Sequence, residues 1–156
     1  MSVKAIVIDQ YRELVNRASK AVQGVSVPQD GWIQTVRKAL QMTAPQLAKR
    51  LGVTRAMIYK TEKAEVEGGI TLKKMHEVAN AMDCRFVYAI VPAHAEGTVE
   101  AYIKHKATKM AADILKRTNI NMALESQDLT PEKIDRELER MVEEILKGRP
   151  SDLWNE

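Results

Sequence analysis

Polar and basic residues recur through residues 43–63, and several of them would share one exposed side of a short helix. Arg55 and Tyr59 are one helical turn apart. An arginine can donate two hydrogen bonds to guanine O6 and N7 in the DNA major groove, and an alanine can touch a thymine methyl. Lysines nearby would add counterion release from phosphates. This chemistry is recognition of a polyanion, and its candidate contact residues are Thr43, Gln46, Lys49, Thr54, Arg55, Ala56, Tyr59, Lys60 and Lys63.

Two short helices must position these side chains. The patterns over 44–51 and 54–63 each begin at or next to a threonine that can cap a helix, and they meet at Gly52-Val53. A turn with glycine, followed by a helix with a free polar face, is what a helix-turn-helix needs, because its second helix enters a major groove. The expected partner is double-stranded DNA. Thr43, Gln46 and Lys49 would hold a phosphate beside the first of the two helices.

The charge is distributed unevenly along the chain. The formal net charge is +3, yet residues 36–63 carry seven Lys and Arg against the single acid Glu62. Residues 122–156 carry five basic residues against ten acidic ones. A basic segment and an acidic tail predict one part that binds a polyanion and another that stays off DNA.

Helical periodicity accounts for most of the remaining chain. The expected organisation is an N-terminal helical arm over 1–23, a helix-turn-helix domain over 24–83, a strand over 84–92 and a C-terminal helical region for dimerisation or partner binding over 93–156. Within it, helices are predicted over 3–22, 31–41 with Asp30 as its cap, 71–82, 96–116 and 130–148, while 120–127 is ambiguous. The closing Leu153-Trp154 either docks on the body or anchors a partner.

The strand poses a question of pairing. Residues 84–92 are rich in aromatic and β-branched types and end at Pro92. A single strand cannot satisfy its own hydrogen bonds, so this one needs a neighbour. The same strand of a second subunit is the simplest choice, and a short segment over 6–8 is the other.

Catalysis and metal binding find no support in the residue pattern. The lone Cys84 has no C-x-x-C partner, and His76, His94 and His105 lack metal-ligand spacing. No paired carboxylates, nucleophile with a base, or glycine-rich phosphate loop appears. We therefore expect no enzyme activity and no cofactor. With no apolar run of roughly 18 residues and no signal-peptide pattern, we expect a cytoplasmic protein that does not contact a membrane.

The motif residues carry a family resemblance. The spacing in Thr43-Ala44-x-x-Leu47-Ala48, Gly52-Val53-Thr54-Arg55, Ile58 and Glu62 resembles the XRE or lambda-repressor-like helix-turn-helix family. That resemblance implies a lambda-repressor-like helix-turn-helix bundle. Together with the strand over 84–92 and the C-terminal helices, the expected fold is mainly α, a lambda-repressor-like bundle with one short β-strand and a C-terminal helical extension. The resemblance also implies a structural ion pair between Arg37 and Glu62.

A narrower resemblance covers more of the chain. The segments 31–33 with Arg37, 68–72, 87–92, 122–127 and the closing Leu153-Trp154 are similar to the family called mobile mystery protein A. Its members are encoded beside a Fic-domain protein, which implies an autoregulatory repressor and a Fic-type toxin as partner. Antitoxins that inhibit Fic enzymes directly carry a Ser/Thr-x-x-x-Glu-Gly/Asn helix, and the nearest string here, 61–66, lacks the final Gly or Asn.

Two functions of different kinds follow as expectations. The first is a sequence-specific transcriptional repressor that acts as a homodimer on its own operon, with two recognition helices in successive major grooves. The alternative is an antitoxin that binds and neutralises a Fic-type toxin through its acidic C-terminal helices.

Overall fold

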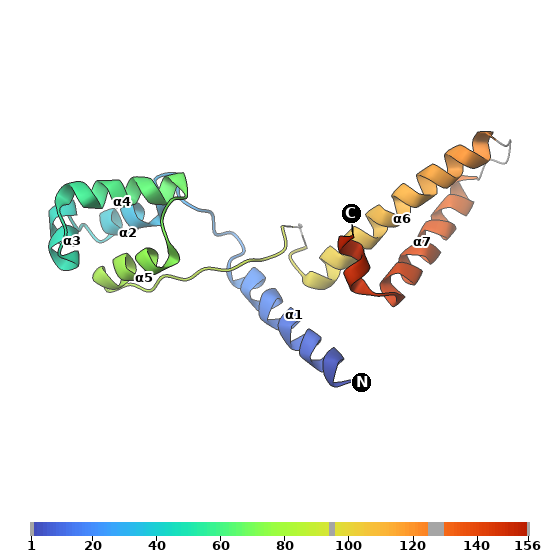
Figure 1. The fold of residues 1–156 in the computed structure, drawn as a ribbon, viewed down its shortest axis with the longest axis horizontal. Coiled ribbons are helices and arrows are strands. Elements are labelled where there is room, and N and C mark those ends of the chain that lie inside the picture. The colour runs from blue at the N-terminus through green and yellow to red at the C-terminus, as the bar shows by residue number, and fades with distance from the viewer. Residues whose placement is uncertain (1, 94–95, 125–129, 156) are drawn as a thin grey trace. The chain divides into compact units, whose positions relative to one another are not determined.

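The computed structural model describes residues 2–93, 96–124 and 130–155, with side chains given outside 119–124. Across these ranges the fold is mainly helical, as expected (Figure 1). In chain order the elements are α1 (Val3–Ala21), α2 (Gly31–Ala39), α3 (Ala44–Leu51), α4 (Arg55–Glu67), α5 (Leu72–Ala81), α6 (Val99–Leu124), α7 (Pro131–Lys147) and the 3-10 helix η1 (Pro150–Trp154). The ambiguous stretch 120–127 continues α6 as far as Leu124, while 125–127 and His94 lie outside the described residues.

The predicted strand over 84–92 is wrong for the single chain. Those residues run without regular secondary structure, and the described residues contain no strand anywhere. The suggested internal partner, 6–8, lies inside α1. Residue propensity could not supply a ladder, because a strand exists only when a second strand accepts and donates its hydrogen bonds.

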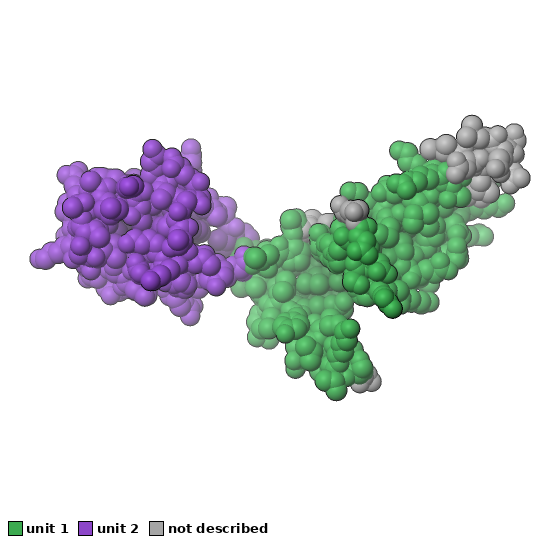
Figure 2. All heavy atoms as spheres, in the orientation of Figure 1, with its two compact units in different colours: residues 1–23, 90–156 green, residues 24–89 purple. Residues whose placement is uncertain are grey.

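The chain divides into two compact units, which Figure 2 draws in different colours. Unit 2 is Gly24–Ala89 and contains α2 to α5. Unit 1 combines Met1–Gln23 with Ile90–Glu156, so the N-terminal arm and the C-terminal helices belong together. The candidate contact residues all lie in unit 2.

Unit 2 is built on one apolar core. α3 packs on α4 and α5, and α2 packs on α4 and α5. Leu47, Ile58 and Val78 are the largest side chains that are completely buried. The rest of the buried cluster consists of Ile33, Ala44, Ala48, Met75 and Met82. Each helix contributes one apolar stripe, so its opposite face is left to solvent.

The start of α2 is capped by a residue distant in sequence. Asp30 occupies the N-cap position but makes no side-chain hydrogen bond there, so the predicted Asp30 cap is wrong. Instead, the Glu65 carboxylate on α4 accepts hydrogen bonds from the backbone N–H groups of Trp32 at 2.6 Å and Ile33 at 2.9 Å. A carboxylate satisfies the free N–H groups of the first turn and complements the helix dipole. This contact ties α2 to α4.

Gly31 allows this approach and gives a stability prediction. Its φ is +79°, and a Cβ there would lie 2.8 Å from Glu65 Oε2. Gly31→Ala should destabilise unit 2 by roughly 1–3 kcal/mol, because it adds left-handed strain and displaces the cap. Gly24→Ala is the matched control, since Gly24 has a φ of +80° with nothing within 4 Å. In urea denaturation followed by circular dichroism, the transition midpoint of Gly31→Ala should be lower than that of Gly24→Ala. Equal midpoints would refute this role of Glu65.

Unit 1 has its core between α6 and α7. Ala107, Ala111, Val142 and Leu153 are buried together, and η1 packs on both helices. Leu153 therefore docks on the body, which was one of the two expectations for the C-terminus. The next residue, Trp154, remains 53% exposed. Its ring lies 4.2 Å from Lys106 Nζ and 6.0 Å from the ring of Tyr102.

Helix α1 is joined to the rest of unit 1 near its C-terminal end. Asn16 Oδ1 accepts a hydrogen bond from the Val99 N–H at 2.8 Å, and its Nδ2 donates to Glu100 Oε2 at 2.8 Å. The second bond lowers the pKa of Glu100. None of the α1 residues is buried. Its amphipathic pattern is as expected, but its apolar stripe remains exposed, with Val3, Tyr11 and Leu14 between 60% and 79% exposed.

Candidate nucleic-acid interface

A tight turn sets the geometry between α3 and α4. Gly52 ends α3 with a φ of +68°, a left-handed conformation that favours glycine. Thr54 then caps α4, because its hydroxyl accepts a hydrogen bond from the Met57 N–H at 3.2 Å. The chain therefore leaves one helix and enters the next within the turn formed by residues 52–54.

The beginning of α3 is fixed by a reciprocal cap. The Thr43 hydroxyl accepts from the Gln46 N–H at 3.3 Å, and Gln46 Oε1 accepts from the Thr43 N–H at 2.8 Å. This is a capping box, which satisfies two otherwise free donors. The Thr43 cap was expected from the sequence, whereas the reciprocal hydrogen bond of Gln46, also predicted to contact a phosphate, was not. The spacing of Thr43 and Gln46 was the available signal.

Every candidate contact residue is exposed. Thr43, Gln46 and Lys49 come from α3 and its cap, while Thr54, Arg55, Ala56, Tyr59, Lys60 and Lys63 come from α4 and its cap. The inward face of α4 carries the buried Ile58, Thr61 and Glu62. Each of the two helices therefore has a buried apolar face toward the core and an exposed face that carries the candidate contact residues. Such amphipathicity by itself is common to surface helices.

Arg55 and Tyr59 form a pair on the exposed side of α4. Arg55 Nε donates a hydrogen bond to the Tyr59 hydroxyl at 3.2 Å, and the guanidinium carbon lies 5.4 Å from the ring centre. Both groups sit one turn apart near the beginning of the helix. Bonding through Nε leaves the two terminal nitrogens, Nη1 and Nη2, for a bidentate acceptor such as guanine.

The lysines differ in their local partners. Lys63 Nζ lies 3.6 Å from Glu67 Oε1 in an exposed ion pair. The Glu67 carboxylate partly offsets the positive charge of Lys63 on the surface of α4. Arg50, another basic residue of α3, donates from Nη1 to Asp83 Oδ2 at 2.9 Å and to the Ala81 carbonyl at 3.0 Å. Arg50 therefore links α3 to the end of α5. Lys49 and Lys60 remain as exposed charges of the candidate interface.

The ion pair expected between Arg37 and Glu62 is present. Arg37 Nε donates to Glu62 Oε1 at 2.7 Å, and the side chains are 9% and 7% exposed. Arg37 Nη1 also donates to the Met42 carbonyl at 3.2 Å. The pair joins α2 to α4 behind the exposed face. The Arg37 side chain therefore makes its contacts inside unit 2.

Glu65 is the important residue that sequence reasoning missed. The helix predicted over 54–63 is longer than expected, because α4 continues to Glu67 and ends at Gly68 with a φ of +78°. Glu65 faces inward from this extra turn and caps α2. Its neighbour in the Fic-inhibitor-like string, Thr61, donates to the Met57 carbonyl at 2.8 Å and is 8% exposed. Both polar residues of that string are engaged within unit 2.

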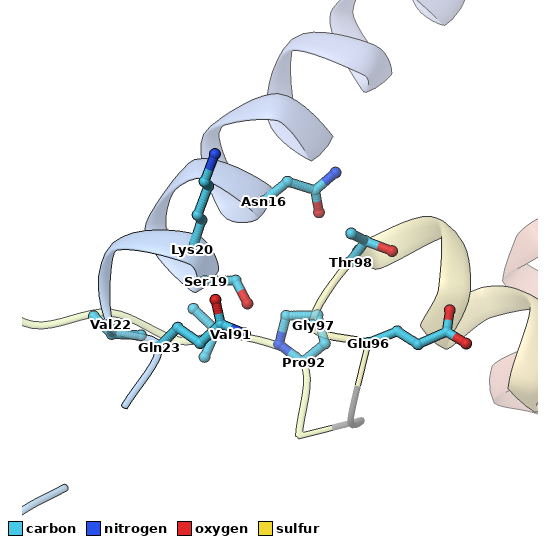
Figure 3. Close-up of a pocket in the computed structure, with 10 residues that line it drawn as sticks. All are labelled: Asn16, Ser19, Lys20, Val22, Gln23, Val91, Pro92, Glu96, Gly97 and Thr98. Atoms are coloured by element: carbon cyan, nitrogen blue, oxygen red, sulfur yellow. The ribbon is translucent and has the colours of Figure 1, made fainter. Parts of the chain in front are cut away.

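The described residues offer little support for other kinds of site. Within them no group of three or more His, Cys, Asp and Glu side chains is placed to hold a metal ion. Over the same ranges, no helix combines the length and apolar character needed to cross a membrane. A hollow of about 510 Å³ lies between the end of α1 and residues 91–92 and 96–98 (Figure 3). Asn16, which lines this hollow, accepts a hydrogen bond from the Val99 N–H at the start of α6. Gly97 lies close to Ser19, since a Cβ at 97 would lie 2.9 Å from Ser19 Oγ.

No family model, curated protein or solved structure matches this chain. The functional interpretation therefore depends on the residues and their geometry.

Proposed function

We propose that this protein is a sequence-specific DNA-binding transcriptional repressor, in which α3, the turn at Gly52 and α4 form a helix-turn-helix of the lambda-repressor-like kind. The observation that carries the proposal is the exposed first part of α4. There Arg55, Ala56 and Tyr59 face solvent beside a buried apolar stripe, and Arg55 is held through Nε. In this role α4 enters the major groove, Arg55 reads guanine and Ala56 meets a thymine methyl.

Phosphate contacts would come from the surrounding basic and capping residues. Lys49 and Lys60 supply charge, while the amide groups at the beginning of α3, beside Thr43 and Gln46, supply oriented donors. These contacts position α4 and carry no sequence information themselves. A homodimer would present two recognition helices to half-sites about one DNA turn apart, and the dimer would repress its own operon in the cytoplasm.

Salt dependence tests the electrostatic part of the proposal. The logarithm of the binding constant should fall linearly with the logarithm of salt concentration, by about 0.9 for each phosphate neutralised. Lys60→Ala should reduce this slope by about 1, because it removes one phosphate contact. Lys109→Ala, which removes an exposed charge from α6 in unit 1, is the matched control and should leave the slope unchanged. Fluorescence anisotropy with labelled duplex gives both slopes, and binding that is insensitive to salt would argue against the proposal.

A second candidate function is an antitoxin that holds a Fic-type toxin, with the DNA-binding unit regulating its expression. The observation that favours it is an exposed acidic face on α7, including Glu132, Asp135, Glu139 and Glu143. An acidic helix attracts a basic partner surface and repels DNA. Co-purification with the neighbouring gene product tests it. Glu139→Lys with Glu143→Lys should abolish co-purification and leave operator binding intact.

A further inference from the structure

Residues 85–91 have no regular secondary structure and run as an extended segment (Figure 1), with unused backbone hydrogen-bonding groups. Their N–H and carbonyl groups make no hydrogen bond to any other described residue. Three of their apolar side chains are largely exposed, namely Val87 at 67%, Tyr88 at 65% and Ile90 at 93%. An exposed apolar edge of this kind is what natural proteins otherwise cover or blunt, because it invites pairing with another strand.

The part of the segment that belongs to unit 2, residues 85–89, is held in place by aromatic contacts. The rings of Phe86 and Tyr88 stack with centres 5.7 Å apart at an angle of 25°. His76 on α5 meets Phe86 edge-on at 5.1 Å and Tyr88 at 6.3 Å. Side chains at alternate positions of extended chain share a face, so Phe86 and Tyr88 anchor one face while the backbone edges remain open. The edge is therefore already extended before any partner arrives.

We propose that this segment pairs antiparallel with the same segment of a second copy of the chain, with Tyr88 opposite the partner's Tyr88. This inference rests on the proposed function, because a two-fold DNA site requires a dimer. It names the surface that makes the dimer. The strand is absent from the single chain and forms only when both copies contribute to the ladder.

Three features of the sequence select a second copy and this register. Pro92, which has no N–H, would lie opposite the partner's Cys84 in a non-hydrogen-bonded pair at the end of the ladder, where proline is tolerated. Ile90 would lie against the partner's Phe86, a favourable aromatic and β-branched pair that covers the most exposed side chain of the segment. Arg85, the single charged residue of 85–91, would face the partner's Val91, so no like charges meet.

Disulfide trapping tests the register in the full-length protein. In a Cys84→Ala background, Tyr88→Cys should form an intermolecular disulfide on mild oxidation, because non-hydrogen-bonded antiparallel pairs place Cα atoms about 4.5 Å apart. Ile90→Cys is the matched control on the same face. Its own counterpart would be four residues away along the strand, about 14 Å, and should not cross-link although Ile90 is more exposed. Trapping at both positions or only at Ile90 would overturn the proposed register.

A proline substitution tests the ladder itself without touching the aromatic stack. In this register Val87 is in a hydrogen-bonded pair, so Val87→Pro removes one backbone donor from each copy. The dimer dissociation constant, measured by sedimentation, should rise by at least about tenfold relative to Val87→Ala. Equal dissociation constants for the two variants, or a wild-type protein that is monomeric, would overturn the pairing. In the latter case pairing with a strand of another protein would be the remaining use of this edge.

The same samples separate this inference from the proposed function. Binding of a monomeric Val87→Pro protein to a single DNA half-site would leave the helix-turn-helix proposal intact whatever the dimer does. Conversely, a wild-type protein that is trapped through Tyr88→Cys but binds no duplex at low salt would retain the pairing and lose the repressor.

Discussion

Glu62→Ala should destabilise unit 2 by about 3–5 kcal/mol, because it leaves the Arg37 guanidinium buried without its carboxylate. The two side chains are 9% and 7% exposed, so water cannot replace the lost partner. The Met42 carbonyl still accepts one hydrogen bond from Arg37 but carries no charge. Urea denaturation followed by helical circular dichroism would measure the loss as a lower transition midpoint.

The neighbouring residue supplies a control on the same helix. Lys63→Ala breaks the pair with Glu67, whose side chains are 73% and 62% exposed, and should cost about 0–1 kcal/mol. Replacing both buried partners, as Arg37→Met with Glu62→Leu, should recover most of the stability lost in Glu62→Ala. A Glu62→Ala protein as stable as Lys63→Ala would contradict a structural role for the buried pair.

Arg55→Ala should weaken binding to the preferred DNA site by about five- to 150-fold, which corresponds to roughly 1–3 kcal/mol of lost base discrimination. The fold should be unaffected, since Arg55 is exposed and bonds only within α4. The loss should be concentrated on sites that carry the recognised guanine. Competition binding between the preferred duplex and one with that base pair changed would measure it.

Tyr59→Phe separates the positioning of Arg55 from its charge. This variant removes the hydroxyl that accepts from Arg55 Nε at 3.2 Å but keeps the ring under the guanidinium. We expect reduced discrimination at the guanine with an unchanged salt slope. Arg55→Ala that binds preferred and altered sites as well as the wild type does would show that α4 does not read bases through this residue.

Helices and caps were the part of the fold that local pattern could predict. Thr43, Thr54, Thr71 and Thr130 each cap a helix where the sequence placed a helix start. The apolar stripe around Leu47 and Ile58 follows helical spacing and is buried in one core. These features depend on residues within one or two turns of each other, so a single sequence contains them.

Contacts between distant residues were harder to infer. Glu65 caps α2 from more than 30 positions away, and Asp30 appeared to be the better cap because it is adjacent. Gly31, with a φ of +79°, leaves room for that contact, and its sequence neighbours do not indicate that Glu65 lies there. Arg37 and Glu62 were paired through a family resemblance, since their separation in sequence carries no periodic signal.

The segment 84–92 illustrates a different limit. Its β-branched and aromatic residues specify an extended conformation, and Phe86 and Tyr88 pack accordingly on His76. Strand formation, however, depends on a second edge that local propensity cannot supply. For the candidate contact residues, exposure was inferred correctly from the polar face of α4, whereas the internal bonds of Gln46 and Tyr59 emerged only from the structure.

Footprinting on a duplex selected from a random-sequence pool would test the central claim most directly. The proposal predicts two protected half-sites with centres about 10–10.5 base pairs apart, and loss of protection with Arg55→Ala. Lys109→Ala on α6 should leave the footprint unchanged. If no sequence is enriched and no base pair is protected at low salt, the protein is not a sequence-specific DNA-binding protein.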